Sequence, residues 1–262
     1  MSNTSDYKVF LCHYTPLADR QSHMVAQLTT TGLTDRTVWI TRWDREALSE
    51  SGKLVPDGDA TEKTESEDWL VTKFNENNLA SAHHGECAIK DRRRAVMSLV
   101  LKHVDAWRQI STGSADWGLV LEDDVIMCDG FATELERYVG DLVGLRWDML
   151  FVGDGCGMHY PKDMMRPGTV VYEKTLPNIH RPKGPTRCAD SYVVTRECAK
   201  KMMGYYDGIP DERKRIMAPA DLWLNKLIDL LKLRVWWGEP TLVTQGSQNG
   251  TFNRSVGKQY MV

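Results

Sequence analysis

The chain has 262 residues, of which 42% are hydrophobic, and this composition is typical of a globular protein that buries a sizeable core. Its formal net charge of −3 argues against a general affinity for nucleic acid or for anionic membranes. No apolar run reaches the roughly 20 residues of a membrane helix, so we expect no integral membrane segment. The polar N-terminus lacks the apolar core of a signal peptide, and the six cysteines show no paired spacing. We therefore expect a cytoplasmic protein with free thiols.

The first half of the chain alternates between strand and helix patterns. Residues 7–14 predict a strand, residues 20–28 a helix, and the β-branched and aromatic residues 37–43 a second strand. Residues 46–84 are polar with few apolar anchors, which predicts a long loop. Residues 86–110 then carry apolar side chains at helical spacing, which predicts a long helix.

The second half continues the alternation. Strands are expected at residues 118–126, 147–155, 169–176 and 191–195, helices at residues 131–143 and 219–233, and strand-like residues at 234–245. Thr195 is a candidate N-cap for a further helix that begins at residue 196. This order predicts an α/β fold with a mostly parallel central sheet and helices on both faces.

Three consecutive acids, Glu122, Asp123 and Asp124, directly follow the apolar residues 119–121 of an expected buried strand. Ligands of open α/β sheets bind at the carboxyl ends of the strands. If the strand continues, alternation places Glu122 and Asp124 on one side and Asp123 on the other. Two adjacent carboxylates are hard oxygen ligands that suit Mn²⁺ or Mg²⁺. The alternative is a strand-end turn whose acids pair with arginines elsewhere.

A cation held by two carboxylates keeps coordination positions for a diphosphate. Nucleotide-sugar transferases use such a cation as a Lewis acid that carries the charge of the departing diphosphate. The chain contains no GxxxxGK[ST] loop that would bind phosphates in another way. The acid cluster therefore favours nucleotide-diphosphate chemistry that depends on a metal.

Several motifs, in order along most of the chain, resemble glycosyltransferase family 25, the lipopolysaccharide and collagen hexosyltransferases. The matching segments are KVFLCHYTPLADRQSHMVAQL, GEC, KHVDAWRQI, WGLVLEDDVIMCDGF, SYVVTRECAKKMM, APADLWL and EPTLVTQ. The segment around LEDDV is the most specific of these matches. Lys102 stands where the family has a serine before its histidine, which corresponds to His103.

The resemblance implies a GT-A fold, in which a Rossmann-like nucleotide half is joined without a break to an acceptor half. It implies one domain over residues 1–262, with a nucleotide-sugar half at about 1–127 and an acceptor half at about 128–262. It also implies a nucleoside-diphosphate hexose as donor, often UDP-linked, a glycan or related hydroxyl as acceptor, and inversion at the anomeric carbon.

The resemblance further implies roles for individual residues. Asp124 would bind Mn²⁺ or Mg²⁺ directly with help from Glu122, and Asp123 would face the ribose or support the metal ligands. The nucleotide is expected near the end of the first strand, beside Tyr14, Thr15 and Arg20. Arg20 suits phosphate recognition because its guanidinium is planar and always charged, although a surface position on the helix is the alternative.

An inverting transfer needs a general base that accepts the proton of the acceptor hydroxyl. Asp221 in the first turn of an expected helix is the first candidate, and Asp190 is the second. The alternative for Asp221 is an ordinary stabiliser of the helix N-terminus. His103 on the long helix is either a satisfied core residue or a structural residue near the donor.

Two other functions compete with the glycosyltransferase. A metal-dependent phosphoesterase or nuclease could use the same acids, although that class usually needs more acids or histidines around two metals. A non-catalytic nucleotide- or carbohydrate-binding module is the third hypothesis.

Overall fold

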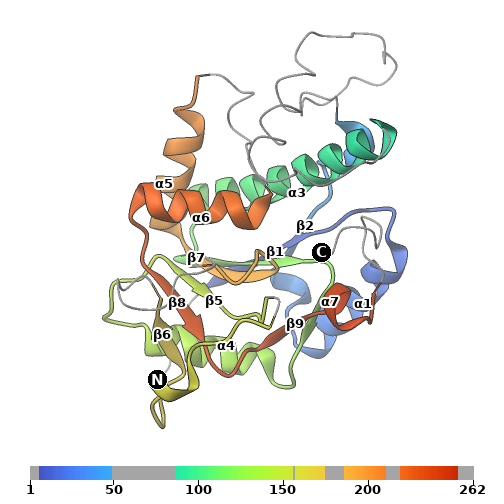
Figure 1. The fold of residues 1–262 in the computed structure, drawn as a ribbon. Coiled ribbons are helices and arrows are strands. Elements are labelled where there is room, and N and C mark those ends of the chain that lie inside the picture. Colours follow the sequence, from blue (N-terminus) through green and yellow to red (C-terminus); the bar gives the residue numbers. More distant parts are fainter. Residues whose placement is uncertain (1–5, 49–85, 156, 175–185, 211–218, 253–262) are drawn as a thin grey trace.

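The computed structural model describes residues 6–48, 86–155, 157–174, 186–210 and 219–252, with side chains of the long helix described from Arg94 onward (Figure 1). Most of the expected polar loop at residues 46–84 lies outside this described part. Within it, no helix has both the length and the apolar character that a bilayer crossing requires.

A seven-stranded sheet forms the centre of the molecule, in the strand order β2-β1-β3-β7-β5-β8-β6 (Figure 1). Its strands are β1 (Tyr7–Cys12), β2 (Thr37–Ile40), β3 (Trp117–Glu122), β5 (Met149–Phe151), β6 (Val171–Glu173), β7 (Ser191–Thr195) and β8 (Val235–Gly238). A second sheet pairs β4 (Val125–Met127) with β9 (Val243–Gln245) in antiparallel orientation.

The central sheet is mixed. Strands β2, β1 and β3 run parallel, as do β5 and β8. Strand β7 lies antiparallel between β3 and β5, and β6 is antiparallel to β8. The prediction of an α/β fold is therefore confirmed, and the parallel strands β2-β1-β3 are compatible with a Rossmann-like half. Because β7 lies between β3 and β5 and is antiparallel to both, the central sheet has fewer parallel strand pairs than expected.

Helices cover both faces of the sheet, as predicted (Figure 1). Helices α3 (Glu86–Thr112), α5 (Arg196–Asp207) and α6 (Ala220–Leu231) lie on one face. Their core contains Val104, Trp107 and Trp223. Helices α1 (Ala18–Thr30) and α4 (Phe131–Asp141) cover the other face.

Short helical elements complete the described chain. They are the 3₁₀ helices η1 (Thr34–Arg36), η2 (Arg45–Ala47) and η3 (Lys162–Met164), and the short helix α7 (Gly246–Asn249). The predicted N-cap is confirmed, because the Thr195 side-chain oxygen accepts a 3.1 Å hydrogen bond from the backbone N–H of Cys198.

The prediction of one strand over residues 118–126 is wrong. The chain leaves the central sheet after Glu122, turns at Asp123 and Asp124, and continues as β4 in the second sheet. Two contacts account for this break. The Asp123 carboxylate is held by groups beside the end of β1, and β4 finds its partner in β9. The acids therefore lie on a turn, and strand alternation does not decide where Asp123 and Asp124 point.

Candidate functional site

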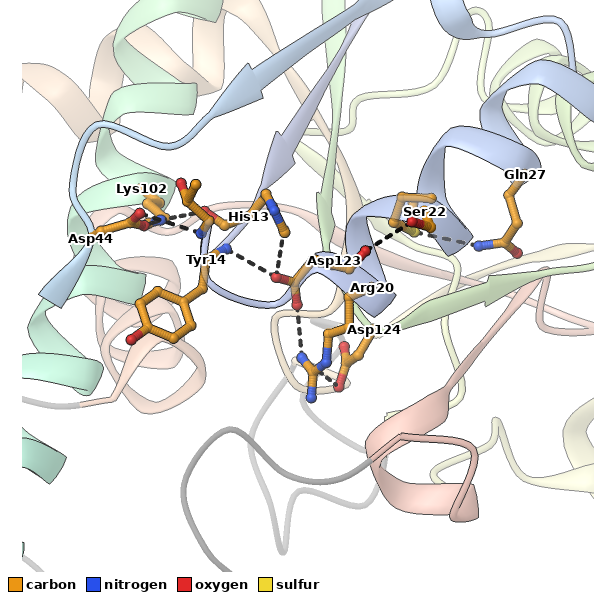
Figure 2. Close-up of polar contacts among 12 residues, drawn as sticks. His13, Tyr14, Arg20, Ser22, Gln27, Asp44, Lys102, Asp123 and Asp124 are labelled. Carbon is orange, nitrogen blue, oxygen red and sulfur yellow. Dashed lines mark hydrogen bonds and ion pairs between the residues drawn. The ribbon is translucent and has the colours of Figure 1, made fainter.

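The candidate site lies at the carboxyl ends of β1 and β3. These strands are parallel neighbours, and their register pairs Cys12 with Glu122. The residues that follow each strand therefore meet, which brings the end of β1 to the acid cluster (Figure 2). A pocket opens at this edge, and α3 forms its apolar wall. Its polar lining consists of Tyr14, Arg20, Arg45, Ser98, Lys102, Glu122 and Asp123.

Asp123 organises the turn through three hydrogen bonds (Figure 2). One carboxylate oxygen lies 2.9 Å from His13 Nδ1 and 2.9 Å from the backbone N–H of Tyr14. The other accepts a 2.7 Å bond from an Arg20 guanidinium N–H. Burial raises the pKa of Asp123, but these hydrogen bonds outweigh burial and lower it below its ordinary value. Asp123 is therefore ionised, and it fixes Arg20 at the pocket.

Arg20 is buried in α1, with 5% of its surface exposed. The structure thus excludes the surface position that the sequence left open for this residue. Its guanidinium also lies 3.9 Å from an Asp124 oxygen and 5.6 Å from the ring centre of Phe252. Arg20 is therefore a fixed positive charge between two of the acids.

Asp124 is 3% exposed, and one of its carboxylate oxygens, Oδ1, is buried without a hydrogen-bond partner in the described part of the chain. The other, Oδ2, accepts a 3.4 Å contact from Gln245 on β9. Burial raises the pKa of Asp124, while a hydrogen bond from Ser247 and the charge of Arg20 oppose the rise. An unpaired buried carboxylate oxygen is costly, so this atom is available to a cation.

Glu122, the last residue of β3, is the third acid of the cluster. Its side chain is 16% exposed and lines the pocket. Burial raises the pKa of Glu122 well above its ordinary range, and the neighbouring charges of Asp124, Asp123 and Asp221 raise it further. A divalent cation would relieve the repulsion between these carboxylates.

The donor set fits the expected Mn²⁺ or Mg²⁺. Glu122 and Asp124 supply carboxylate oxygens, and one Asp124 oxygen has no hydrogen-bond partner among the described residues. The described residues contain no group of three or more His, Cys, Asp and Glu side chains arranged for a metal. A cation held by Glu122 and Asp124 alone would keep coordination positions for waters and for substrate phosphates.

The opposite end of the pocket contains a buried cation that sequence reasoning did not assign to the site. Lys102 on α3 is 2% exposed, and its ammonium donates to the backbone carbonyl of His13 and to the Asp44 carboxylate (Figure 2). The backbone N–H of Thr15, an exposed residue, donates to Asp44 at 3.3 Å. Lys102 thus connects α3, the end of β1 and the segment after β2.

Tyr14 lies between two charged side chains. The Arg45 guanidinium is 4.5 Å from the Tyr14 ring centre, and its Nε donates to the Tyr14 hydroxyl at 2.7 Å. The hydroxyl in turn donates to Glu46. Arg45 and Lys102 carry no sequence signal for a shared site, because they come together only when α3 packs beside η2.

Asp190, the second candidate base, is 1% exposed and directly precedes β7. One carboxylate oxygen accepts a 2.8 Å bond from Ser191, and the other has no hydrogen-bond partner in the ranges that the structure describes. Burial raises the pKa of Asp190 well above its ordinary range, and the charge of Glu122 adds to the rise. Asp190 lies near the acid cluster but does not line the pocket.

Asp221, the first candidate base, is half-buried in the first turn of α6. Its charge raises the pKa values of both Glu122 and His103, so it lies within electrostatic reach of the acid cluster. Burial nevertheless lowers the pKa of His103 to about 4, which keeps that ring neutral at pH 7.

The structure therefore gathers most of the predicted residues at one edge of the sheet. Four of them line the pocket: Tyr14, Arg20, Glu122 and Asp123. The remaining four lie around it: Thr15, Asp124, Asp190 and Asp221. Comparison of the chain with protein-family models and with curated proteins found no match.

Proposed function

We propose that the protein is a metal-dependent glycosyltransferase of the GT-A type, similar to glycosyltransferase family 25. It transfers a hexose from a nucleoside-diphosphate sugar, UDP-linked in our proposal, to a hydroxyl of a glycan or related acceptor with inversion. The catalytic unit is one domain with a nucleotide half and an acceptor half. We place the enzyme in the cytoplasm, with no nucleic-acid partner.

The observation that carries this proposal is the Asp124 oxygen that no described residue pairs, close to Glu122 at the carboxyl ends of parallel strands. That location is where open α/β sheets bind nucleotides. Asp124 and Glu122 would hold Mn²⁺ or Mg²⁺, which would stabilise the negative charge that develops on the departing diphosphate. Arg20 adds a fixed positive charge on the same side for the phosphates.

The remaining pocket residues would bind the nucleotide. The Tyr14 ring, which lines the pocket, offers an aromatic surface, and Arg45 holds the ring in place. Asp123 orients Arg20 and Tyr14 through its three hydrogen bonds. Lys102 keeps the end of β1 fixed to α3, so that this wall of the pocket is formed before the donor arrives.

Asp221 is our candidate for the general base. In an inverting transfer the acceptor oxygen bonds to the anomeric carbon, the bond from that carbon to the diphosphate oxygen breaks, and the base takes the hydroxyl proton. Asp221 is half-buried in the first turn of α6 and lies within electrostatic reach of the acid cluster. Asp190 is a weaker candidate because burial raises its pKa well above the ordinary range, which favours a protonated carboxyl that cannot accept the proton.

The test is release of UDP from UDP-hexoses by the purified chain with Mn²⁺, with and without candidate acceptors. Asp124→Asn should lose both Mn²⁺-dependent UDP binding and transfer. Asp116→Asn is the matched control, because Asp116 is an exposed acid at the opposite end of β3 that pairs with Arg196. Full activity of Asp124→Asn would overturn the metal assignment.

Asp221→Asn tests the base separately. It should keep the donor affinity and lower the transfer rate by at least about 100-fold, the usual contribution of a general base. An equal loss of donor affinity and of transfer would place the base elsewhere. Hydrolysis of phosphate diesters without release of free sugar would favour a phosphoesterase, and UDP binding without turnover would favour a binding module.

A further inference from the structure

Three aromatic side chains form a buried chain of polar contacts that leads to Glu122. Trp107 Nε1 on α3 lies 2.8 Å from the Tyr192 hydroxyl on β7, and that hydroxyl lies 2.9 Å from Nδ1 of His103. The other ring nitrogen, His103 Nε2, lies 3.5 Å from Oε1 of Glu122. All three aromatic residues are at most 1% exposed. Water is therefore excluded as a competing partner for them.

The directions of these contacts follow from the chemistry of the groups. The indole N–H of Trp107 only donates, so the Tyr192 oxygen accepts from it. The Tyr192 hydroxyl hydrogen then needs an acceptor, and His103 Nδ1 is the one that the described residues provide. An Nδ1 atom that accepts carries no hydrogen, which places the hydrogen of the neutral ring on Nε2.

The hydrogen on Nε2 faces the carboxylate of Glu122. Nε2 is buried and has no hydrogen-bond partner among the described residues. Its 3.5 Å separation from Oε1 is longer than a formed hydrogen bond, and such contacts at catalytic sites often shorten when the ligand binds. The Nε2–H group of His103 is therefore a donor that can fix the orientation of the Glu122 side chain.

We propose that Trp107 and Tyr192 set the tautomer of His103, and that His103 is a positioning residue that holds Glu122 in the orientation required for donor binding. The effect of His103 on donor binding rests on the proposed function, whereas the tautomer does not. The same Trp107 stacks on Trp223 of α6 at 5.5 Å between ring centres. Trp107 thus connects the helix that carries Asp221 to the residues that orient Glu122.

The first experiment measures the tautomer directly in the full chain. Nitrogen-15 NMR of labelled histidine distinguishes Nδ1–H from Nε2–H rings, and His103 is recognised among the seven histidines by its contacts with the rings of Trp107 and Tyr192. We expect a neutral ring with hydrogen on Nε2 at pH 7. A ring with hydrogen on Nδ1, alone or on both nitrogens, would overturn the proposal.

Two tyrosine variants supply the matched comparison. Tyr192→Phe removes the donor to Nδ1 and should shift the Nδ1 signal of His103. Tyr138→Phe removes another buried hydroxyl, which donates to the carbonyl of Pro240 from the opposite face of the sheet. That variant should leave the His103 signals unchanged. Equal shifts in both variants, or none in Tyr192→Phe, would contradict the contact.

The second experiment measures UDP affinity with Mn²⁺ in two histidine variants. His103→Gln places an amide N–H near the position of Nε2, while His103→Asn places its amide near Nδ1 and leaves Glu122 without a donor. We expect UDP to bind His103→Asn about tenfold more weakly than His103→Gln, as for a lost hydrogen bond to a charged group. A role limited to core packing would affect both variants alike.

The outcomes separate the two proposals. Equal UDP affinity in His103→Asn, His103→Gln and the unaltered protein would reject His103 as a positioning residue. Absence of UDP binding by the unaltered protein would instead reject the proposed function. In that case the NMR measurement still decides whether Trp107 and Tyr192 set the tautomer.

Discussion

His103 makes the stability of the protein sensitive to acid in a way that can be calculated. The perturbation is His103→Gln, which removes the titrating ring and keeps a side-chain amide. Burial lowers the pKa of His103 in the folded protein to about 4, against an ordinary value of 6.5 in the unfolded chain. The unfolded chain therefore takes up a proton below pH 6.5, and the folded protein does so only below about pH 4.

The direction in which pH changes the stability follows from this difference in pKa between the folded and unfolded states. Because the unfolded state binds the proton more readily, lowering the pH from 7 favours unfolding, and the stability is lost between pH 6.5 and pH 4. Integration gives a loss of about 2 kcal/mol between pH 7 and pH 5, and about 3 kcal/mol once the pH is below 4. The ring is 1% exposed, so solvent screening does not reduce this figure substantially.

The assay is urea unfolding of the unaltered protein and of His103→Gln at pH 7 and pH 5, with EDTA present so that no metal occupies the acids. The groups that face His103 are Glu122, Asp221 and Tyr192, and they remain in both proteins. Raised carboxyl pKa values, such as that of Glu122, stabilise the folded state as the pH falls. Both proteins have this effect, so it largely cancels in the difference between them. The unaltered protein should lose about 2 kcal/mol more than the variant. An equal loss in both proteins would refute the reasoning.

Three further substitutions test contacts elsewhere in the fold. Arg187→Met should lower the free energy of unfolding by about 3–5 kcal/mol in urea, because it leaves the buried Glu239 carboxylate without its guanidinium partner; adding Glu239→Gln should restore part of the loss. Gly153→Ala should lower the free energy of unfolding by about 1–3 kcal/mol in thermal unfolding, because the new Cβ would lie 2.3 Å from an Asp190 oxygen. Unchanged stability would contradict that position of Asp190. Thr195→Ala should cost about 1 kcal/mol through loss of the α5 N-cap, and Thr195→Ser should recover most of it.

The acid cluster illustrates how far local sequence reasoning reaches. The apolar residues before Glu122 identify a buried strand, and the rule for α/β sheets places the acids at its carboxyl end. The structure agrees with that location. The sequence does not reveal that the strand ends at Glu122, because the break depends on contacts with His13 and Arg20, which are more than a hundred residues away.

His103 on α3 also shows that the sequence predicts burial of a side chain but not its partners. Its position on an apolar stripe predicts burial, and the structure finds it 1% exposed. Its partner Tyr192 is 89 residues away in the chain, and β7 brings it there by pairing with β3. Lys102 likewise reaches Asp44 across 58 residues. The sequence near His103 and Lys102 contains no pattern that would identify Tyr192 or Asp44 as their partners.

The sequence by itself determined the alternation of strands and helices, the cap at Thr195 and the presence of three acids at a strand end. These features depend on hydrophobic periodicity and on hydrogen bonds between residues close together in the chain. Only the tertiary structure decided the antiparallel place of β7, the departure of β4 into a second sheet, and the side chains that surround Glu122. The physical reason is that strand order and side-chain partners arise from pairing between distant segments, whose energy is distributed over many contacts.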